Sequence, residues 1–89
     1  LEQYSEALDS INTAIVLAPK GFQPWCLRGM ILGAMGLFTE AQSSFNHALS
    51  LQPDDLCALY NQAIVLRKQN RLEAALSYLE HALTIDPQN

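Results

Sequence analysis

The chain has 89 residues, of which 49% are hydrophobic and 16% charged, and its five Lys and Arg residues and nine Asp and Glu residues give a net charge of −4. This acidic balance argues against nucleic acid and anionic membranes as partners, because both are bound mainly through Lys and Arg. The length allows one domain, and no apolar run approaches the roughly 20 residues of a membrane-spanning helix. Neither Cys26 nor Cys57 belongs to a Cys-x-x-Cys pair, so a reducing, cytoplasmic compartment is expected.

The spacing of apolar residues predicts five helices, at residues 2–17, 23–35, 38–51, 56–69 and 72–85. In the first of these, Tyr4, Leu8 and Ile11 follow the i, i+4, i+7 spacing of a single packed stripe. The second predicted helix differs from the others because it is apolar all round. An exposed helix face normally carries charges, so this helix is expected to contact something on both sides.

Breaks between the predicted helices carry recognisable turn residues. Pro19 and Pro53 each stop a helix, and Asp55 can cap the helix that follows. The shorter breaks contain Gly36 and Asn70. Gly adopts the left-handed backbone that ends a helix most readily, and Asn tolerates it second best. These short connections predict helices that run antiparallel to their neighbours.

The sequence repeats itself at an interval of 34 residues. Five sets of three positions show it: Pro19, Pro53 and Pro87; Ala7, Ala41 and Ala75; Ala14, Ala48 and Ala82; Tyr4, Phe38 and Leu72; Ile11, Phe45 and Leu79. The small residues, with Gly29 and Ala63, are expected to let paired helices approach closely, so replacing one with Leu should cost roughly 1–3 kcal/mol. Each hairpin buries its stripe only by stacking on its neighbours, which makes the array the stable unit.

These residues resemble the tetratricopeptide repeat family, whose 34-residue unit carries a W-x2-L-G-x2-Y, A-x3-F, A and P pattern. The middle unit has Trp25, Gly29, Leu32, Ala41, Phe45, Ala48 and Pro53, and the last has Leu59, Ala63, Leu66, Ala75, Leu79, Ala82 and Pro87. Arg28 and Leu59 depart from the Leu and Trp of the pattern. The resemblance covers the whole chain and implies an all-α solenoid of antiparallel helical hairpins with a right-handed superhelical twist.

The resemblance divides the single domain 1–89 into a truncated repeat and two full repeats. Residues 1–21 correspond to the closing helix of the truncated repeat, and the full repeats occupy 22–55 and 56–89. In this family the opening helices line a concave groove where partner segments lie. The resemblance therefore implies a groove formed by helices 23–35 and 56–69.

A helical projection separates the packing side of these helices from the predicted partner-binding groove. Trp25, Gly29 and Leu32 fall on the packing side. The predicted groove consists of Gln23, Cys26, Leu27, Met30, Cys57, Tyr60, Asn61, Ile64, Arg67 and Lys68. An apolar or amphipathic segment of a partner protein with an acidic residue would fit it. The alternative is that Leu27 and Met30 are buried inside the hairpin.

Asn61 resembles the groove asparagine with which some members of the family hold a ligand's backbone, since an amide both donates and accepts hydrogen bonds. The alternative is a solvated or locally bonded side chain. The position one repeat earlier is Leu27, which excludes a continuous asparagine ladder. Some members of the family bind the C-terminal carboxylate of a ligand through Lys, Arg and Asn. This mode is not expected here, because Gln23, Cys26, Met30 and Cys57 supply no cations.

Basic residues cluster at the end of the fourth predicted helix, where Arg67, Lys68 and Arg71 lie. They could contact a ligand, but the helix dipole equally favours cations at a helix C-terminus. Arg28 falls on the packing side and is expected to pair with a carboxylate of a neighbouring hairpin.

No catalysis, cofactor or metal ion is expected. His47 and His81 lie one period apart on the closing helices and are expected to be exposed, whereas both cysteines lie on the opening helices. A base and a nucleophile would thus point apart, and two His about 8–10 Å apart cannot share a metal. A disulfide between Cys26 and Cys57 needs Cα atoms within about 7 Å, which packed helices seldom offer.

The favoured interpretation is a protein–protein interaction scaffold that binds a protein or peptide partner. The alternatives are a structural, self-associating segment of a longer repeat array, or the docking arm of a larger multidomain protein. Both end helices present apolar residues without a covering helix: the first helix lacks its hairpin partner and leaves Tyr4, Leu8, Ile11 and Ile15 bare, and the last lacks a capping helix over Leu76, Leu79 and Leu83. The isolated chain is therefore expected to form a homo-oligomer through its terminal helices.

Overall fold

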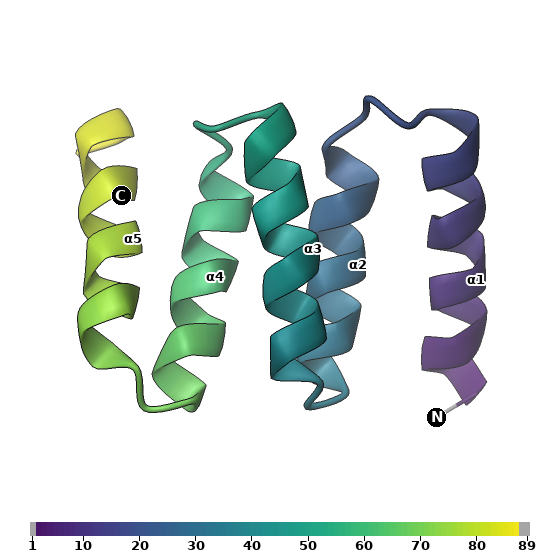
Figure 1. The fold of residues 1–89 in the computed structure, drawn as a ribbon, viewed down its shortest axis with the longest axis horizontal. Coiled ribbons are helices and arrows are strands. Elements are labelled where there is room, and N and C mark those ends of the chain that lie inside the picture. The colour runs from purple at the N-terminus through teal and green to yellow at the C-terminus, as the bar shows by residue number, and fades with distance from the viewer. Residues whose placement is uncertain (1, 88–89) are drawn as a thin grey trace.

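The computed structural model describes residues 2–87, which form five α-helices and no strand. The helices are α1 (Glu2–Leu17), α2 (Gln23–Ala34), α3 (Phe38–Leu51), α4 (Leu56–Lys68) and α5 (Leu72–Ile85). They stand side by side and run alternately up and down (Figure 1). The predicted all-α class is confirmed, and each observed helix boundary lies within one residue of the predicted one.

Residues with a left-handed backbone follow α2 and α4, as predicted. Gly36 has φ = 80° and Asn70 has φ = 62°. Beyond Gly36, the N–H of Leu37 donates a hydrogen bond of 2.9 Å to the carbonyl of Leu32. Such a bond satisfies one of the carbonyls that a helix end leaves without a partner. The same bond recurs one repeat later, so both hairpins turn in the same way.

The start of α4 is fixed by a side chain. The carboxylate of Asp55 accepts a hydrogen bond from the N–H of Ala58 at 3.2 Å, which confirms the predicted cap. At the start of α2, Pro24 lies in the first turn, where a missing N–H costs no helical hydrogen bond.

The core lies between α2, α3 and α4, around Phe45, which is 1% exposed. Ala41 and Ala48 beside it are fully buried. A Cβ added to Gly29 would lie 2.6 Å from Cε1 of Phe45, a distance that real structures do not show. The small residues therefore do permit the close helix approach that the repeat pattern predicts.

A polar contact also repeats at the 34-residue interval. The guanidinium of Arg28 donates to Oδ1 of Asn12 at 3.2 Å, and Gln62 donates to Oδ1 of Asn46 at 2.7 Å. Arg28 also donates to Oγ of the buried Ser44 at 2.6 Å. The expectation that Arg28 pairs with a carboxylate is wrong, because neutral oxygens of the two flanking closing helices already accept its hydrogen bonds.

The two ends of the array differ. On α1, Leu8, Ile11 and Ile15 are only partly exposed because that face packs against α2. The expectation that this stripe is bare is therefore only partly correct. On α5, Leu72 and Leu76 are each more than half exposed, because no described helix lies beyond it.

Candidate partner-binding groove

Three hollows lie along α2 and α4, the opening helices of the two repeats. The first hollow, at the N-terminal ends of α2 and α4, has a volume of about 390 Å³ and is lined by Phe22, Gln23, Cys26, Leu27, Asp55 and Cys57. The central hollow, of about 220 Å³, is lined by Gly29, Met30, Gly33, Ala34, Phe38, Phe45, Asn61, Ile64, Val65 and Lys68. The α5 hollow, of about 400 Å³, is lined by Tyr60, Ala63, Ile64, Arg67, Ala75 and Leu79.

Side chains join the three hollows into one surface, which is called the groove below. Ile64 lines both the central hollow and the α5 hollow. Sγ of Cys57 in the first hollow lies 3.9 Å from Sδ of Met30 in the central hollow. Each of the ten residues of the sequence-predicted groove lines at least one hollow.

Sequence reasoning missed the contribution of α5 to this surface. Ala75 and Leu79 line the α5 hollow, although the repeat pattern indicated only that they pack within the hairpin. It also missed Phe22 and Asp55 in the first hollow. Both precede a helix, where a helical projection assigns no face.

The apolar floor of the groove is open to solvent. Leu27 is 49% exposed, Met30 is 41% exposed and Ile64 is 42% exposed. The alternative that Leu27 and Met30 are buried inside the hairpin is therefore wrong. Cys26 differs from them, because it is only 4% exposed and packs in the core. It lies beneath the floor and contributes to the groove mainly through its contact with Cys57.

Asn61 is locally bonded in the free chain. Its Nδ2 donates to the carbonyl oxygen of Cys57 at 2.7 Å and lies 3.4 Å from Sγ of the same residue. Its Oδ1 accepts no hydrogen bond from residues 2–87. Its amide oxygen is therefore available to accept a hydrogen bond from a ligand, whereas its amide nitrogen is already engaged with Cys57.

Charge differs between the two ends of the groove. Arg67 and Lys68 lie exposed in the last turn of α4, where Arg67 lines the α5 hollow and Lys68 the central hollow. Asp55 lies at the opposite end, in the first hollow. The cations also interact favourably with the C-terminal dipole of α4, so stabilising the helix and contacting a ligand are compatible roles.

Two thiols meet where the first hollow reaches the core. Sγ of Cys26 lies 3.1 Å from Sγ of Cys57, and both cysteines are free. The expectation that no disulfide joins them agrees with the two free thiols, but the sequence did not indicate how closely the contact between α2 and α4 brings the sulfur atoms together. Burial, together with the neighbouring Cys57, raises the pKa of the Cys26 thiol well above its usual range. Cys26 therefore remains protonated at neutral pH.

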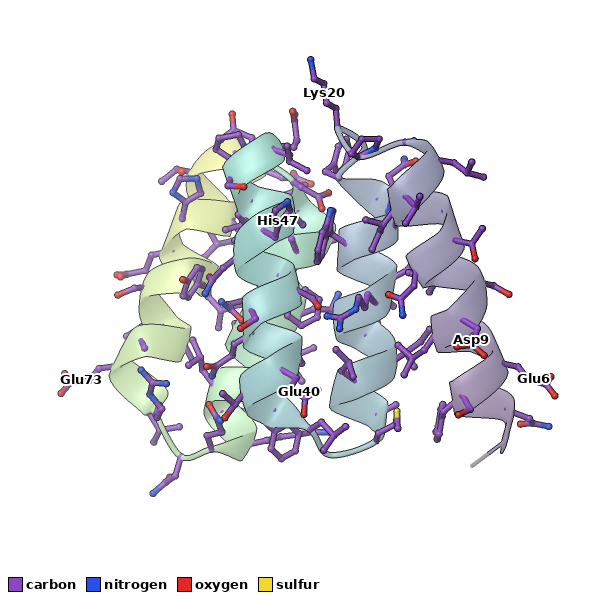
Figure 2. The ribbon with its side chains drawn as sticks, turned by 45° about the vertical axis from the view of Figure 1, so that its right-hand side comes forward. Glu6, Asp9, Lys20, Glu40, His47 and Glu73 are labelled. Carbon is purple, nitrogen blue, oxygen red and sulfur yellow. The ribbon has the colours of Figure 1, made fainter. Side chains whose placement is uncertain are left out.

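The histidines lie away from the groove. His47 is exposed on α3 (Figure 2) and stacks on Trp25 with ring centroids 3.9 Å apart. His81 is also exposed, and its Nε2 lies 3.6 Å from the carboxylate of Asp54. Neither meets a cysteine, so the structure offers no Cys–His pair among the described residues. Across residues 2–87, no three His, Cys, Asp or Glu side chains are grouped so that they could hold a metal ion.

Acidic side chains on the end helices point outward. Figure 2 shows Glu6 and Asp9 projecting from α1 and Glu73 projecting from α5. In the described part of the chain, none of the helices has the length and apolar character to cross a bilayer.

Comparison with known proteins identifies the class. A tetratricopeptide repeat model matches residues 22–88, and the chain belongs to this family. The TPR domain of Arabidopsis OM64 superposes with a TM-score of 0.93 at 22% identity, covering 99% of this chain and 73% of that one. Among curated proteins, no sequence matches closely enough to indicate a relative.

Two further solved structures share the fold. The TPR2B domain of yeast Sti1, in a complex with pHsp70, gives a TM-score of 0.91 at 23% identity and covers 98% of this chain and 70% of that one. MamA from AMB-1 gives a TM-score of 0.86 at 26% identity, covering 99% of this chain. The chain spans 48% of the MamA chain, about half its length.

Proposed function

We propose that this chain is a protein-interaction scaffold that binds a segment of a partner protein in the groove. The observation that carries the proposal is the exposure of Leu27, Met30 and Ile64 at hollows that adjoin one another. Covering the exposed part of one such side chain contributes roughly 1 kcal/mol, because more than half of it is already buried. Three of them on one surface favour a partner that removes them from water.

The groove favours an apolar or amphipathic segment with an acidic residue. Leu27, Met30 and Ile64 offer apolar contacts, and a thioether adapts its shape to different partners. An acidic residue of the partner would be attracted to Arg67 and Lys68 at one end and repelled by Asp55 at the other. This difference in charge gives the bound segment a preferred direction.

The yeast Sti1 domain was solved with pHsp70, and its likeness supports peptide binding as a use of this fold. At 23% identity it does not extend that ligand to this chain. The residues argue for a different ligand, because Gln23, Cys26, Met30 and Cys57 carry no cations that could hold a terminal carboxylate.

The test is to select binding segments from a random peptide library displayed on phage and to measure the affinity of one labelled peptide by fluorescence anisotropy. Leu27→Glu combined with Met30→Glu is expected to weaken binding at least tenfold, because each removes apolar contact and introduces a charge that must be desolvated. Helicity and the melting temperature should change little, since both side chains are nearly half exposed.

The matched control is Ser43→Glu combined with Ser50→Glu, which adds the same charge on exposed positions of α3. This variant should bind as the unaltered chain does. Equal loss in both double variants would mean that net charge matters and that the groove is not the site. Selected peptides whose binding survives Leu27→Glu with Met30→Glu would also contradict the proposal.

A second candidate function is self-association through the end helices. Its support is a row of exposed leucines on α5, a feature that often marks an interaction surface: Leu72, Leu76, Leu79 and Leu83. If α5 of one chain packs against α5 of a second chain, a closed dimer forms, because neither chain has another α5 surface free to bind a third chain. Sedimentation at micromolar concentration should reveal a dimer or a larger species, and a chain that stays monomeric would exclude this candidate.

A further inference from the structure

Cys26 and Cys57 lie 31 residues apart in the sequence, yet their sulfur atoms are 3.1 Å apart. They lie on different full repeats, in α2 and α4 respectively, and these two helices are in direct contact. A disulfide has an S–S length of about 2.05 Å, so the sulfurs need to approach by only about 1 Å. Rotation of the two side chains about their Cα–Cβ bonds moves the sulfur atoms over distances of this order.

The two thiols differ in their access to solvent. Cys57 is exposed in the first turn of α4, whereas Cys26 is 4% exposed and packs in the core. A small oxidant dissolved in water therefore meets Cys57 first. Because burial raises the pKa of the Cys26 thiol, Cys26 stays protonated and does not compete as the first nucleophile.

We propose that Cys26 and Cys57 form a reversible covalent modification site, where hydrogen peroxide converts the two thiols into a disulfide that joins the first full repeat to the second. Such bonds in reducing compartments are usually transient. The proposal is independent of which partner the groove binds, because it concerns only the two cysteines of this chain.

The reaction proceeds in two steps that balance. The Cys57 thiolate attacks one oxygen of peroxide, the O–O bond breaks, and Cys57 becomes a sulfenic acid while the released hydroxide takes up a proton to form water. The Cys26 sulfur then attacks the Cys57 sulfur, the S–O bond breaks, and the Cys26 proton leaves with the hydroxide as a second water. The two thiols lose two electrons in total, which reduce one peroxide to two waters.

The disulfide would close a loop of 31 residues and fix α2 against α4. Closing a loop of this size restricts the unfolded chain and so stabilises the folded one. We expect the melting temperature of the oxidised chain to exceed that of the reduced chain by at least roughly 10 °C.

The experiment treats the reduced chain with a small excess of hydrogen peroxide and follows its intact mass. The expected result is a loss of about 2 Da, the mass of two hydrogen atoms, that dithiothreitol reverses. Trypsin cleaves after Lys20, Arg28 and Arg67, so the cross-link should join peptide 21–28 to peptide 29–67. Oxidation of Met30 or Met35 adds mass and is thereby distinguished.

Single-cysteine variants provide the matched controls. In Cys26→Ser, peroxide should leave Cys57 as a sulfenic acid that dimedone traps, or as an intermolecular dimer. In Cys57→Ser, Cys26 should react far more slowly with N-ethylmaleimide than Cys57 does in the unaltered chain, because it is buried. Neither variant should show the peroxide-dependent rise in melting temperature. If a serine variant loses helicity, the mass measurement on the unaltered chain still decides the question.

Three results would overturn the proposal. The first is an unchanged mass under conditions that oxidise Met30 or Met35. The second is a predominance of disulfide-linked dimers, which would mean that Cys57 reaches another chain more easily than Cys26. The third is a tightly held Cu(I) or Zn²⁺ ion that protects both thiols, since Cys26, Cys57 and Met30 would then be metal ligands.

Discussion

Phe45 and Leu79 occupy the same position of two successive repeats, but Phe45 is 1% exposed and Leu79 is 37% exposed. The difference comes from their neighbours. α3, which carries Phe45, is covered by α2 on one side and by α4 on the other, whereas α5, which carries Leu79, contacts only α4 among the described helices. The same repeat pattern therefore produces a closed core in one repeat and an open apolar surface in the next.

This comparison explains why the groove and the end of the array are connected. Leu79 lines the α5 hollow, so the uncovered repeat contributes part of the groove wall. In a solenoid, each repeat is stabilised by its own packing and by the interface with each neighbour. A residue at the same position can thus be structural in an inner repeat and available for contact in an outer one.

The largest expected effect tests this difference directly. Phe45→Ala should destabilise the chain by about 3–5 kcal/mol, because it leaves a closed cavity in the core. Leu79→Ala should cost only roughly 1–2 kcal/mol, because part of the side chain is already in water and its space can fill with solvent. Urea denaturation followed by circular dichroism measures both. Equal losses would show that α5 is covered in solution as α3 is.

A second, smaller effect concerns the fit of Gly29 against Phe45. The equivalent pair one repeat later is Ala63 and Leu79. Because the Leu79 side chain is smaller than that of Phe45, it leaves room for the Cβ of Ala63. Gly29→Ala should destabilise by roughly 1–3 kcal/mol through the clash with Phe45, partly offset by about 1 kcal/mol from the higher helix propensity of Ala.

A double-mutant cycle sharpens the same point. Gly29→Ala combined with Phe45→Leu recreates the pair of the last repeat, so its loss of stability should be at least about 1 kcal/mol less than the sum of the single losses. Additive losses would mean that the aromatic ring moves aside without strain. The clash at 2.6 Å would then not explain why Gly occupies this position.

The smallest expected effect on stability is at α5, the helix that no other described helix covers on its outer side. Leu76→Glu with Leu83→Glu should change the free energy of unfolding of the monomer by less than about 0.5 kcal/mol per site, because both side chains are exposed. If α5 mediates self-association, the same variant should raise the dimer dissociation constant at least tenfold in sedimentation equilibrium. An unchanged dissociation constant would place the contact elsewhere, for example on α1.

The tertiary structure decided several points that no periodicity shows. Residues 26 and 57 are placed by the relative position of two helices, which depends on the packing of all the side chains between them. Their Sγ–Sγ distance of 3.1 Å therefore could not be predicted from spacing in the sequence. The partners of Arg28 were missed for a similar reason, since Asn12 and Ser44 belong to two other helices.

The sequence by itself determined the local features. Helix boundaries followed from residues such as Gly36, Asn70 and Asp55, which act through backbone angles and hydrogen bonds within a few residues. The apolar face of α2 was predictable because a helix has a fixed angular step. The exposure of Leu79 could not be predicted in this way, because the burial of a side chain depends on whether another helix covers it. A repeat fixes the contacts that recur at every 34th residue, while the folded array decides which of them face a neighbour and which face water.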